Sequence, residues 1–249
     1  MHIAALYDIH GNLPALEAVL DEVRRAAVDA VVVGGDVVPG PMPGACLALL
    51  AALPMPVHYL RGNGDRVVCA VRRGADVSGE VPAAFADVMR WCAEALTDAD
   101  VAALEGWPAT LRLPVGGPGA TLFCHATPRS DVDIFTRLTA EERLFAAFDG
   151  VDAALVVCGH THMPFDRRVR GIRVVNAGSV GMPFGDPGAD WLLIGDEVSP
   201  RHTRYDLDAA AARVRATAYP QAEAFASGSI LRPPSATEML AAFNAAATE

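Results

Sequence analysis

Short apolar runs alternate with amphipathic stretches in the first part of the chain. Residues 3–7 are apolar, and the leucines and valines that follow recur at helical spacing from Leu13 to Val23. A second apolar run at 31–33 completes a strand, a helix and a strand within about thirty residues, which is typical of a βαβ unit with parallel strands. We therefore predict an α/β fold that begins with a parallel sheet and continues with a third strand at 57–60.

The middle of the chain combines a helical region with several short strands. Residues 66–106 have helical spacing, interrupted at 74–79, and Thr97 with the acidic residues after it resembles a helix start. Two apolar runs then flank Gly116-Gly117-Pro118-Gly119, which predicts a β-hairpin. We expect strands at 111–115, 121–124, 153–158, 172–175, 191–194 and 201–205. The strand at 172–175 should form a hairpin with a strand that ends near Val169, and a helix is expected at 139–148.

The last part of the chain, from about residue 207, is rich in alanine and mostly helical, with breaks at its prolines. Neither an internal repeat nor a clear linker separates this tail from the rest. We therefore predict a single domain over residues 1–249, with the segment 207–249 packed on it as a helical extension. Leu240 and Phe243 could instead make a dimer contact, which leaves a homodimer as an alternative.

Composition narrows the class of protein. Hydrophobic residues make up 52% of the 249 residues, enough for one sizeable core. The net charge is −10 and no Arg-rich block occurs, so no footprint for duplex nucleic acid is visible. The five cysteines are scattered singly, and the chain opens on a strand without a cleavable apolar leader. The longest apolar run, 45–57, is broken by Pro54 and Pro56, so we expect a cytoplasmic protein without a membrane span.

Polar side chains able to bind metal ions follow the predicted strands, at the point where each strand ends. In chain order they are Asp8, His10, Asp36, Asn63, His125, His160 and His162. Taken singly, each has an ordinary explanation as a turn, cap or strand-end residue. Because ligands bind at the carboxyl ends of strands in open α/β sheets, such a fold would bring all of them into one cleft.

The chemistry of this set favours two metal ions. Seven side chains are too many for one tetrahedral zinc ion, but they suit two ions that share a carboxylate. Mixed oxygen and nitrogen ligands favour Mn, Fe, Co or Zn over Ca or Mg. Two divalent ions outweigh two carboxylates, so the pocket would attract an anion such as a phosphoryl group. Cys124 and Cys158 could supply a thiolate, but buried strand cysteines are the simpler interpretation.

The order of these motifs resembles the calcineurin-like metallophosphoesterase family. The blocks that carry the resemblance are Asp8-Ile9-His10, Gly35-Asp36, Gly62-Asn63-Gly64-Asp65, His125 and Gly159-His160-Thr161-His162. The segment 176–181 is also similar to the Asn-Pro-Gly-Ser-Val-Gly of the small bacterial and archaeal branch typified by the YfcE phosphodiesterase. The resemblance spans residues 8–181 and implies a four-layer α/β/β/α sandwich.

The resemblance also implies a role for each residue. One metal ion would be bound by Asp8, His10, Asp36 and His162, and the second by Asp36, Asn63, His125 and His160, with Asp36 bridging. A hydroxide between the ions would attack phosphorus, with Asp36, Asn63 and His125 as the catalytic residues. Asn63 would also contact the substrate phosphate. Arg129 is a further candidate for that contact, although a solvated loop arginine is the simpler interpretation. Two manganese ions are expected, with iron, zinc, cobalt or nickel as alternatives.

Three positions depart from the family pattern. Gly64 replaces a histidine that assists the leaving group or contacts the phosphate, which favours diesters over monoesters but could also mean weak activity. Without that histidine, Asp65 has no obvious partner. Ala126 replaces the glycine that usually follows the histidine of the fourth block, and Phe184 lies where the branch often has arginine.

We therefore predict a dinuclear metal-dependent phosphodiesterase that acts on a small phosphodiester or nucleotide-type substrate. The alternatives are a phosphomonoesterase and a catalytically silent interaction scaffold on the same fold, and amide cleavage at the same metals is a weaker third. The sequence does not name the physiological substrate, because cyclic nucleotides, nucleic-acid ends and phospholipid-derived diesters all present the same phosphoryl group.

Overall fold

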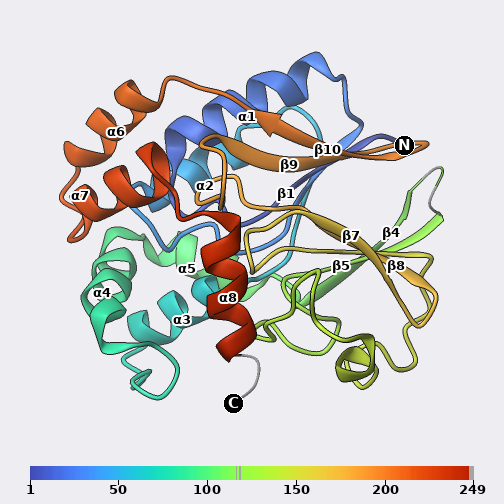
Figure 1. Ribbon diagram of the computed structural model, residues 1–249. Helices are drawn as coiled ribbons and strands as arrows, with labels where there is room; N and C mark the ends of the chain where they lie inside the picture. Colours follow the sequence, from blue (N-terminus) through green and yellow to red (C-terminus); the bar gives the residue numbers. More distant parts are fainter. Residues whose placement is uncertain (116, 118, 247–249) are drawn as a thin grey trace.

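Two mixed five-stranded sheets lie face to face in the computed structural model, which describes residues 1–115, 117 and 119–246 (Figure 1). The first sheet has the order β10-β9-β1-β2-β3 and consists of β1 (Ile3–Leu6), β2 (Ala30–Val33), β3 (Val57–Tyr59), β9 (Ala189–Ile194) and β10 (Val198–Thr203). The second has the order β4-β5-β6-β8-β7 and consists of β4 (Thr110–Val115), β5 (Gly119–Cys124), β6 (Leu155–Cys158), β7 (Phe165–Val169) and β8 (Ile172–Asn176).

Strand direction confirms the predicted βαβ start and both hairpins. β1, β2 and β3 are parallel to one another. β9 pairs antiparallel with β1, and β10 pairs antiparallel with β9. In the second sheet β5, β6 and β8 are parallel, whereas β4 and β7 are antiparallel edge strands. Gly116 and Pro118 of the predicted β4–β5 turn lie outside the described residues.

Alternation along β1 explains how the first sheet packs on two sides. Ile3 and Ala5 point into a core between the two sheets, together with Tyr7 just after the strand, whereas Ala4 and Leu6 point into a core under the helices. The Tyr7 hydroxyl donates to the carbonyl oxygen of Val157 in the opposite sheet at 3.0 Å. The phenol therefore ties the two sheets together through a buried contact.

Helices cover the outer face of the first sheet and gather at the carboxyl ends of the strands (Figure 1). The α-helices before the second sheet are α1 (Leu13–Arg25), α2 (Pro43–Ala51), α3 (Asn63–Arg72), α4 (Ala86–Ala95) and α5 (Asp98–Glu105), with a short 3₁₀ helix η1 (Ala83–Phe85) before α4. Asn12 caps α1, since its side chain accepts from the Ala15 amide at 3.2 Å. Thr97 caps α5 in the same way, as the sequence predicted.

The outer layer on the second sheet is thinner than predicted. Instead of an α-helix over 139–148, the chain forms a 3₁₀ helix, η2 (Glu141–Leu144), followed by turns. Leu144 and Phe148 are both buried, as the helical pattern required, and they pack on the second sheet. The amides of Arg143 and Phe145 bond three residues back and not four, so the segment is wound more tightly than the spacing indicated.

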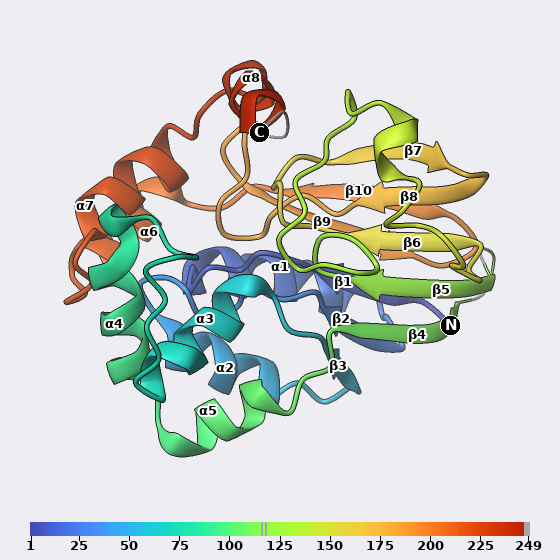
Figure 2. The same ribbon diagram turned by 90° about the horizontal axis from the view of Figure 1, so that it is seen from below.

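The tail forms α6 (Leu207–Arg215), α7 (Ala222–Phe225), a π-helical segment η3 (Ala226–Leu231) and α8 (Ala236–Ala246). Both views place α7 near α4, whereas α6 packs against α1, and α8 stands apart from them beside the strand ends (Figures 1 and 2). The segment from α6 to η3 therefore packs on the helical layer of the first sheet. In α8, the ring of Phe243 lies 6.1 Å from that of Phe184, between centroids. Among the described helices, none has the length and apolar character needed to cross a membrane.

Candidate metal centre

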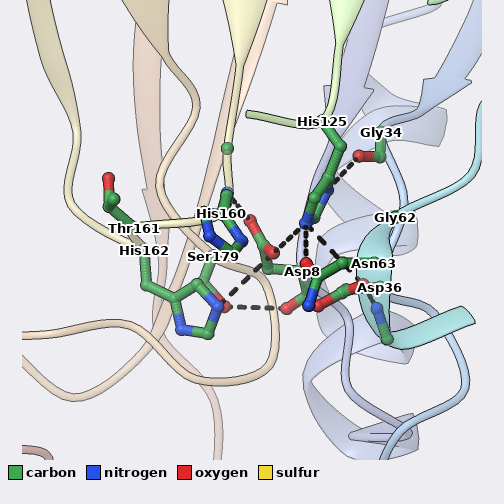
Figure 3. Close-up of polar contacts among 12 residues, drawn as sticks. Asp8, Gly34, Asp36, Gly62, Asn63, His125, His160, Thr161, His162 and Ser179 are labelled. Carbon is green, nitrogen blue, oxygen red and sulfur yellow. Dashed lines mark hydrogen bonds and ion pairs between the residues drawn. The ribbon is translucent and has the colours of Figure 1, made fainter. Parts of the chain in front are cut away.

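All seven predicted ligands lie at one edge of the two sheets. Figure 3 labels all of them except His10, which lies close to Asp8 and His162. Asp8 and His10 follow β1, and Asp36 follows β2. His125 follows β5, while His160 and His162 follow β6. Asn63, expected in a loop before a helix at 66, is instead the first residue of α3. The sheet edge therefore gathers side chains from both halves of the sandwich, as the strand-end pattern predicted.

The carboxylate of Asp8 lies among three imidazoles. Its Oδ1 atom lies 3.4 Å from Nε2 of His162, 3.8 Å from Nε2 of His125 and 4.0 Å from Nε2 of His10. Potential ligand atoms within 4.8 Å of one another form two overlapping groups, one of Asp8, His10 and His162 and one of Asp8, Asp36 and His125. The residues thus offer two adjacent places for a cation.

Asp36 also faces both groups. Its Oδ1 atom lies 3.7 Å from Nε2 of His125, and its Oδ2 atom lies 3.8 Å from Nε2 of His10. The Gly64 amide donates to Oδ1 at 2.7 Å and fixes the orientation of the carboxylate. The two oxygens of one side chain are therefore directed at different imidazoles.

One carboxylate oxygen in this cluster lacks a hydrogen-bond partner. Oδ2 of Asp8 accepts from the His160 amide at 2.9 Å. Oδ1 of Asp8 is the one buried side-chain nitrogen or oxygen without a partner in the described part of the chain. Burying an unpaired carboxylate oxygen is costly, so the site has the unsatisfied negative charge that a metal ion would neutralise.

The ring nitrogens give a second reason to place cations here. Nδ1 of His10 lies 3.1 Å from the Pro39 carbonyl oxygen, and Nδ1 of His162 lies 2.9 Å from that of Met182. A carbonyl only accepts, so each Nδ1 carries the proton of a neutral ring. Their Nε2 atoms then face each other with lone pairs at 3.1 Å, which needs either a further proton or a metal ion between them.

His125 repeats this arrangement. Its Nδ1 atom lies 2.9 Å from the Gly34 carbonyl oxygen, so Nδ1 donates and the Nε2 lone pair points into the site. That lone pair meets Oδ1 of Asn63 at 3.0 Å, which also only accepts. Each contact places two electron-rich atoms together, and a cation between them would satisfy both. The donor set therefore fits divalent metal ions.

Burial and neighbouring charges divide the four imidazoles into two kinds. Burial and the nearby imidazole of His162 lower the pKa of His10, and burial with His125 lowers the pKa of His160 to about 4. For His125 and His162 burial also favours the neutral ring, but the carboxylates outweigh it and raise the pKa. His10 and His160 are thus held neutral, as metal ligands must be.

The backbone of the site is held in an uncommon conformation. Seven described residues other than glycine have a positive φ, and five of them are predicted ligands. They are Asp8 at 53°, His10 at 48°, Asp36 at 52°, His160 at 66° and His162 at 55°. Such residues are disfavoured in this region and persist where the surrounding structure fixes them, which is typical of functional sites.

Hydrogen bonds between loops fix these conformations. The Asp8 amide donates to the Gly35 carbonyl at 3.1 Å, and the His10 amide donates to the Asp36 carbonyl at 2.9 Å. Ser179 Oγ donates to the Asp8 carbonyl at 2.7 Å and accepts from the Met182 amide at 2.8 Å. The segment 176–181, noted in the sequence only for its resemblance, therefore braces the Asp8 loop.

Asp65 is the functional residue that the sequence interpretation missed. The expectation that it lacks a partner is wrong, because its buried carboxylate accepts from the amides of Asp36, Val37, Val38 and Gly62 at 2.8–3.1 Å. Burial and Asp36 raise its pKa to about 7, and these backbone donors oppose that rise. Asp65 thus shapes the loop that carries Asp36. Its place two residues after Asn63 was the available clue.

The remaining departures from the family pattern have structural counterparts. A β-carbon at Gly64 would lie 2.4 Å from Cγ of Pro39, so no side chain fits there without movement. Phe184 stacks on His162 with ring centroids 5.3 Å apart and an interplanar angle of 23°. It covers one side of a predicted ligand, which the sequence did not indicate. Ala126 is buried beside His125.

Arg129 lies in a different environment from the seven ligands. Its guanidinium donates to the Asp149 carbonyl oxygen at 2.9 Å and is 55% exposed. It lines a cavity of about 380 Å³ together with His125 and Arg66. A separate cavity is lined by His10, Asp36, Asn63, His160 and His162. The predicted contact between Arg129 and a substrate phosphate stays a prediction.

Comparison with known proteins agrees with this geometry. An uncharacterized protein of Methanocaldococcus jannaschii is 25% identical over 181 residues, which cover 72% of this chain and 69% of that protein. The crystal structure of a metallophosphoesterase from Sphaerobacter thermophilus aligns at 25% identity with a TM-score of 0.71, covering 91% of this chain and 97% of that one. A hypothetical protein from Pyrococcus horikoshii shares the fold, with a TM-score of 0.78 at 18% identity over 90% of this chain and 97% of that one.

The family follows from a match that covers most of the chain. Residues 1–195, which include all seven predicted ligands, match the model of the calcineurin-like phosphoesterase superfamily domain. Every strand of the two sheets except β10 falls within this range. The family resemblance drawn from the motifs is therefore confirmed, and the protein belongs to the calcineurin-like phosphoesterase superfamily, a family of metal-dependent phosphoric ester hydrolases.

Proposed function

We propose that this protein is a phosphodiesterase that uses two divalent metal ions, and that these ions are manganese. The observation that carries the proposal is the unpaired Oδ1 atom of Asp8, buried among three imidazole nitrogens within 4.0 Å. The first ion would be held by Asp8, His10, Asp36 and His162, and the second by Asp36, Asn63, His125 and His160. Asp36 would be shared by both ions, since its two oxygens face different imidazoles, those of His125 and His10.

The bound ions would lower the pKa of a water towards about 7 and orient the phosphoryl oxygens. The chain contributes the orientation of each ligand. The backbone carbonyls of Pro39, Met182 and Gly34 hold three Nδ1 atoms, so that the Nε2 lone pairs face inward. α3 begins at Asn63, and the positive end of its dipole therefore lies beside the site and favours an anionic phosphoryl group.

Gly64 supports a diester substrate. No side chain at this position can donate a proton to the leaving alcohol, and the contact of a β-carbon with Pro39 shows that the space is closed. The enzyme should therefore depend on the intrinsic leaving ability of the alcohol. Rates for a series of aryl esters should fall steeply as the pKa of the phenol rises.

The first experiment measures metal content and substrate preference together. With Mn²⁺ added, hydrolysis of bis-p-nitrophenyl phosphate should exceed that of p-nitrophenyl phosphate, and metal analysis should give two ions per chain. A catalytically silent scaffold need not hold two ions, so the analysis separates the two hypotheses. Metal-independent hydrolysis, or a clear preference for the monoester, contradicts the proposal.

A substitution at the bridging residue tests the assignment of ligands. Asp36→Asn removes the charge that both ions would share. Turnover should fall well beyond the roughly 100-fold that is lost when only a hydrogen-bond partner of a metal ligand is removed. Asp87→Asn, at a side chain 77% exposed on α4, is the matched control and should retain the rate of the unmodified protein. Equal rates for Asp36→Asn and the control would remove Asp36 from the centre.

A further inference from the structure

Five of the predicted ligands line a cavity of about 410 Å³ whose other walls are mostly apolar. Its floor is formed by His10, Asp36, Asn63, His160 and His162. The walls are formed mainly by Phe85, Val88, Met89, Met182, Tyr219 and Phe225. A volume of this size is typical of small-molecule sites, which combine apolar walls with a few polar groups at one end.

Two distant parts of the chain build the walls and are joined to each other. Phe85, Val88 and Met89 come from η1 and α4, whereas Tyr219 and Phe225 come from the tail. The side-chain amide of Gln221 donates to the Ala84 carbonyl oxygen at 2.8 Å and links the tail to η1. The cavity is therefore formed in the folded chain without a ligand.

Aromatic packing holds the tail wall in place. Tyr219 makes edge contacts with Trp91 of α4 at 5.4 Å and with Phe225 at 6.1 Å between ring centroids. Phe225 is directly followed by η3, whose π-helical turns place Ser229 on the same cavity. π-Helical turns are frequent at functional sites, and this one lines the cavity through Ser229.

The charge of the cavity limits what it can bind. The sequence contains no lysine, so all 20 basic side chains are arginines. None of the residues that line the cavity is an arginine. A second phosphate or a carboxylate on the substrate would therefore find no cationic side chain away from the metal ligands, and burying it unpaired would be costly.

We infer that this cavity binds an uncharged, apolar ester group of the substrate, so that the enzyme selects phosphodiesters with an aryl or alkyl group over nucleotides. The inference rests on the proposed phosphodiesterase function and assigns its substrate class. Met89 and Phe225 are half-buried or buried, and together with Phe85 they surround the group next to the phosphoryl position. The tail thus takes part in specificity although it lies outside the matched family domain.

The test uses p-nitrophenyl phosphodiesters that share one leaving group. The second ester group is phenyl, methyl or the 5′-carbon of thymidine, and kcat/KM is measured with Mn²⁺. The phenyl ester should exceed the methyl ester by at least about tenfold, the effect of placing a methylene-sized or larger group in an apolar pocket. Equal values for the phenyl and methyl esters, or a preference for the thymidine ester, would overturn the inference.

A pair of exposed phenylalanines provides the variant and its control. Phe85 is 47% exposed and lines the cavity, whereas Phe145 is 38% exposed and contacts Arg170 elsewhere. Phe85→Ala should lower kcat/KM several-fold for the phenyl ester and much less for the methyl ester, whose small group makes less contact with the ring. Phe145→Ala should change neither. An equal loss on both esters in Phe85→Ala would mean a general defect and not a specificity role.

A binding measurement separates this inference from the proposed activity. Diphenyl phosphate should bind the metal-loaded protein at least about tenfold more tightly than dimethyl phosphate in calorimetry, and Phe85→Ala should reduce that ratio. If no ester is hydrolysed but this preference is present, the activity fails and the assigned cavity stands. If the methyl ester is hydrolysed with Mn²⁺ but diphenyl phosphate shows no preference, the phosphodiesterase stands and the inference fails.

Discussion

Gly159 is the residue whose replacement tests the packing of the centre most directly. It lies at the end of β6, where its backbone is held on both sides. Its amide donates to the His125 carbonyl at 2.8 Å, and its own carbonyl accepts from the side-chain amide of Asn176 at 2.6 Å. A β-carbon at this position would lie 2.4 Å from Oδ2 of Asp8 and 2.5 Å from Cδ1 of Tyr7.

The expected cost of Gly159→Ala follows from these contacts. Both distances are far below van der Waals contact, and the side chains of Asp8 and Tyr7 are fully buried and cannot turn away. Overpacking of this kind costs about 1–3 kcal/mol, and two rigid neighbours place the variant near the upper end. For a chain of this size about 3 kcal/mol corresponds to a fall in Tm of about 6–12 °C.

The assay compares thermal unfolding and metal content for Gly159→Ala and Gly228→Ala. A β-carbon at Gly228 would meet no atom within 4 Å, so this control should leave Tm nearly unchanged or raise it slightly. Gly159→Ala should also bind metal more weakly, because the methyl group displaces the Asp8 carboxylate. A Tm within about 2 °C of the unmodified protein, with full metal content, would refute the reasoning.

Three further predictions address the same centre. Gly64→His should lower Tm and restore no hydrolysis of p-nitrophenyl phosphate, because its β-carbon would lie 2.4 Å from Cγ of Pro39; a gain of monoesterase rate contradicts this. Removing the metal should lower the free energy of unfolding by about 2.7 kcal/mol, compared with protein in metal at 100 times its Kd. Urea unfolding with and without a chelator measures this difference, and equal urea midpoints would contradict metal binding. In the metal-free protein, His160 has its pKa lowered to about 4, below the value of about 6.5 in the unfolded chain. Its neutral form is therefore favoured on folding, and the stability of the unmodified protein relative to His160→Gln should fall between about pH 6.5 and pH 4; a constant difference across that range excludes this linkage.

Much of the fold was accessible from hydrophobic pattern because its elements bury one regular face. The runs at β1, β2 and β6 are continuous apolar stretches, as buried parallel strands require. The α-helix expected at 139–148 was wrong because Leu144 and Phe148 satisfy the burial pattern equally well from a 3₁₀ helix and turns. Periodicity records which side chains are buried, and it does not distinguish these ways of winding the backbone between them.

The candidate site could be read from the sequence where its residues are ligands, and not where they act through backbone atoms. Asp8 and His162 stand directly after apolar strands or their turns, so their place in the chain indicates their place in space. Asp65 acts by accepting four amides from two loops, which depends on how those loops meet. The cavity walls from Tyr219 and Phe225 arise from packing between the tail and α4, for which no motif exists.

The division between the sheets and the tail has a consequence for how such a protein can diversify. The predicted ligands lie after strand ends, in loops with positive φ, or at the start of α3, where most substitutions would disturb several hydrogen bonds at once. Tyr219 lies between α6 and α7, and Phe225 and Ser229 belong to α7 and η3; these segments contribute no residue to the candidate centre. Changes in these segments can reshape the cavity one side chain at a time, so that selection can alter substrate choice while the chemistry is inherited intact.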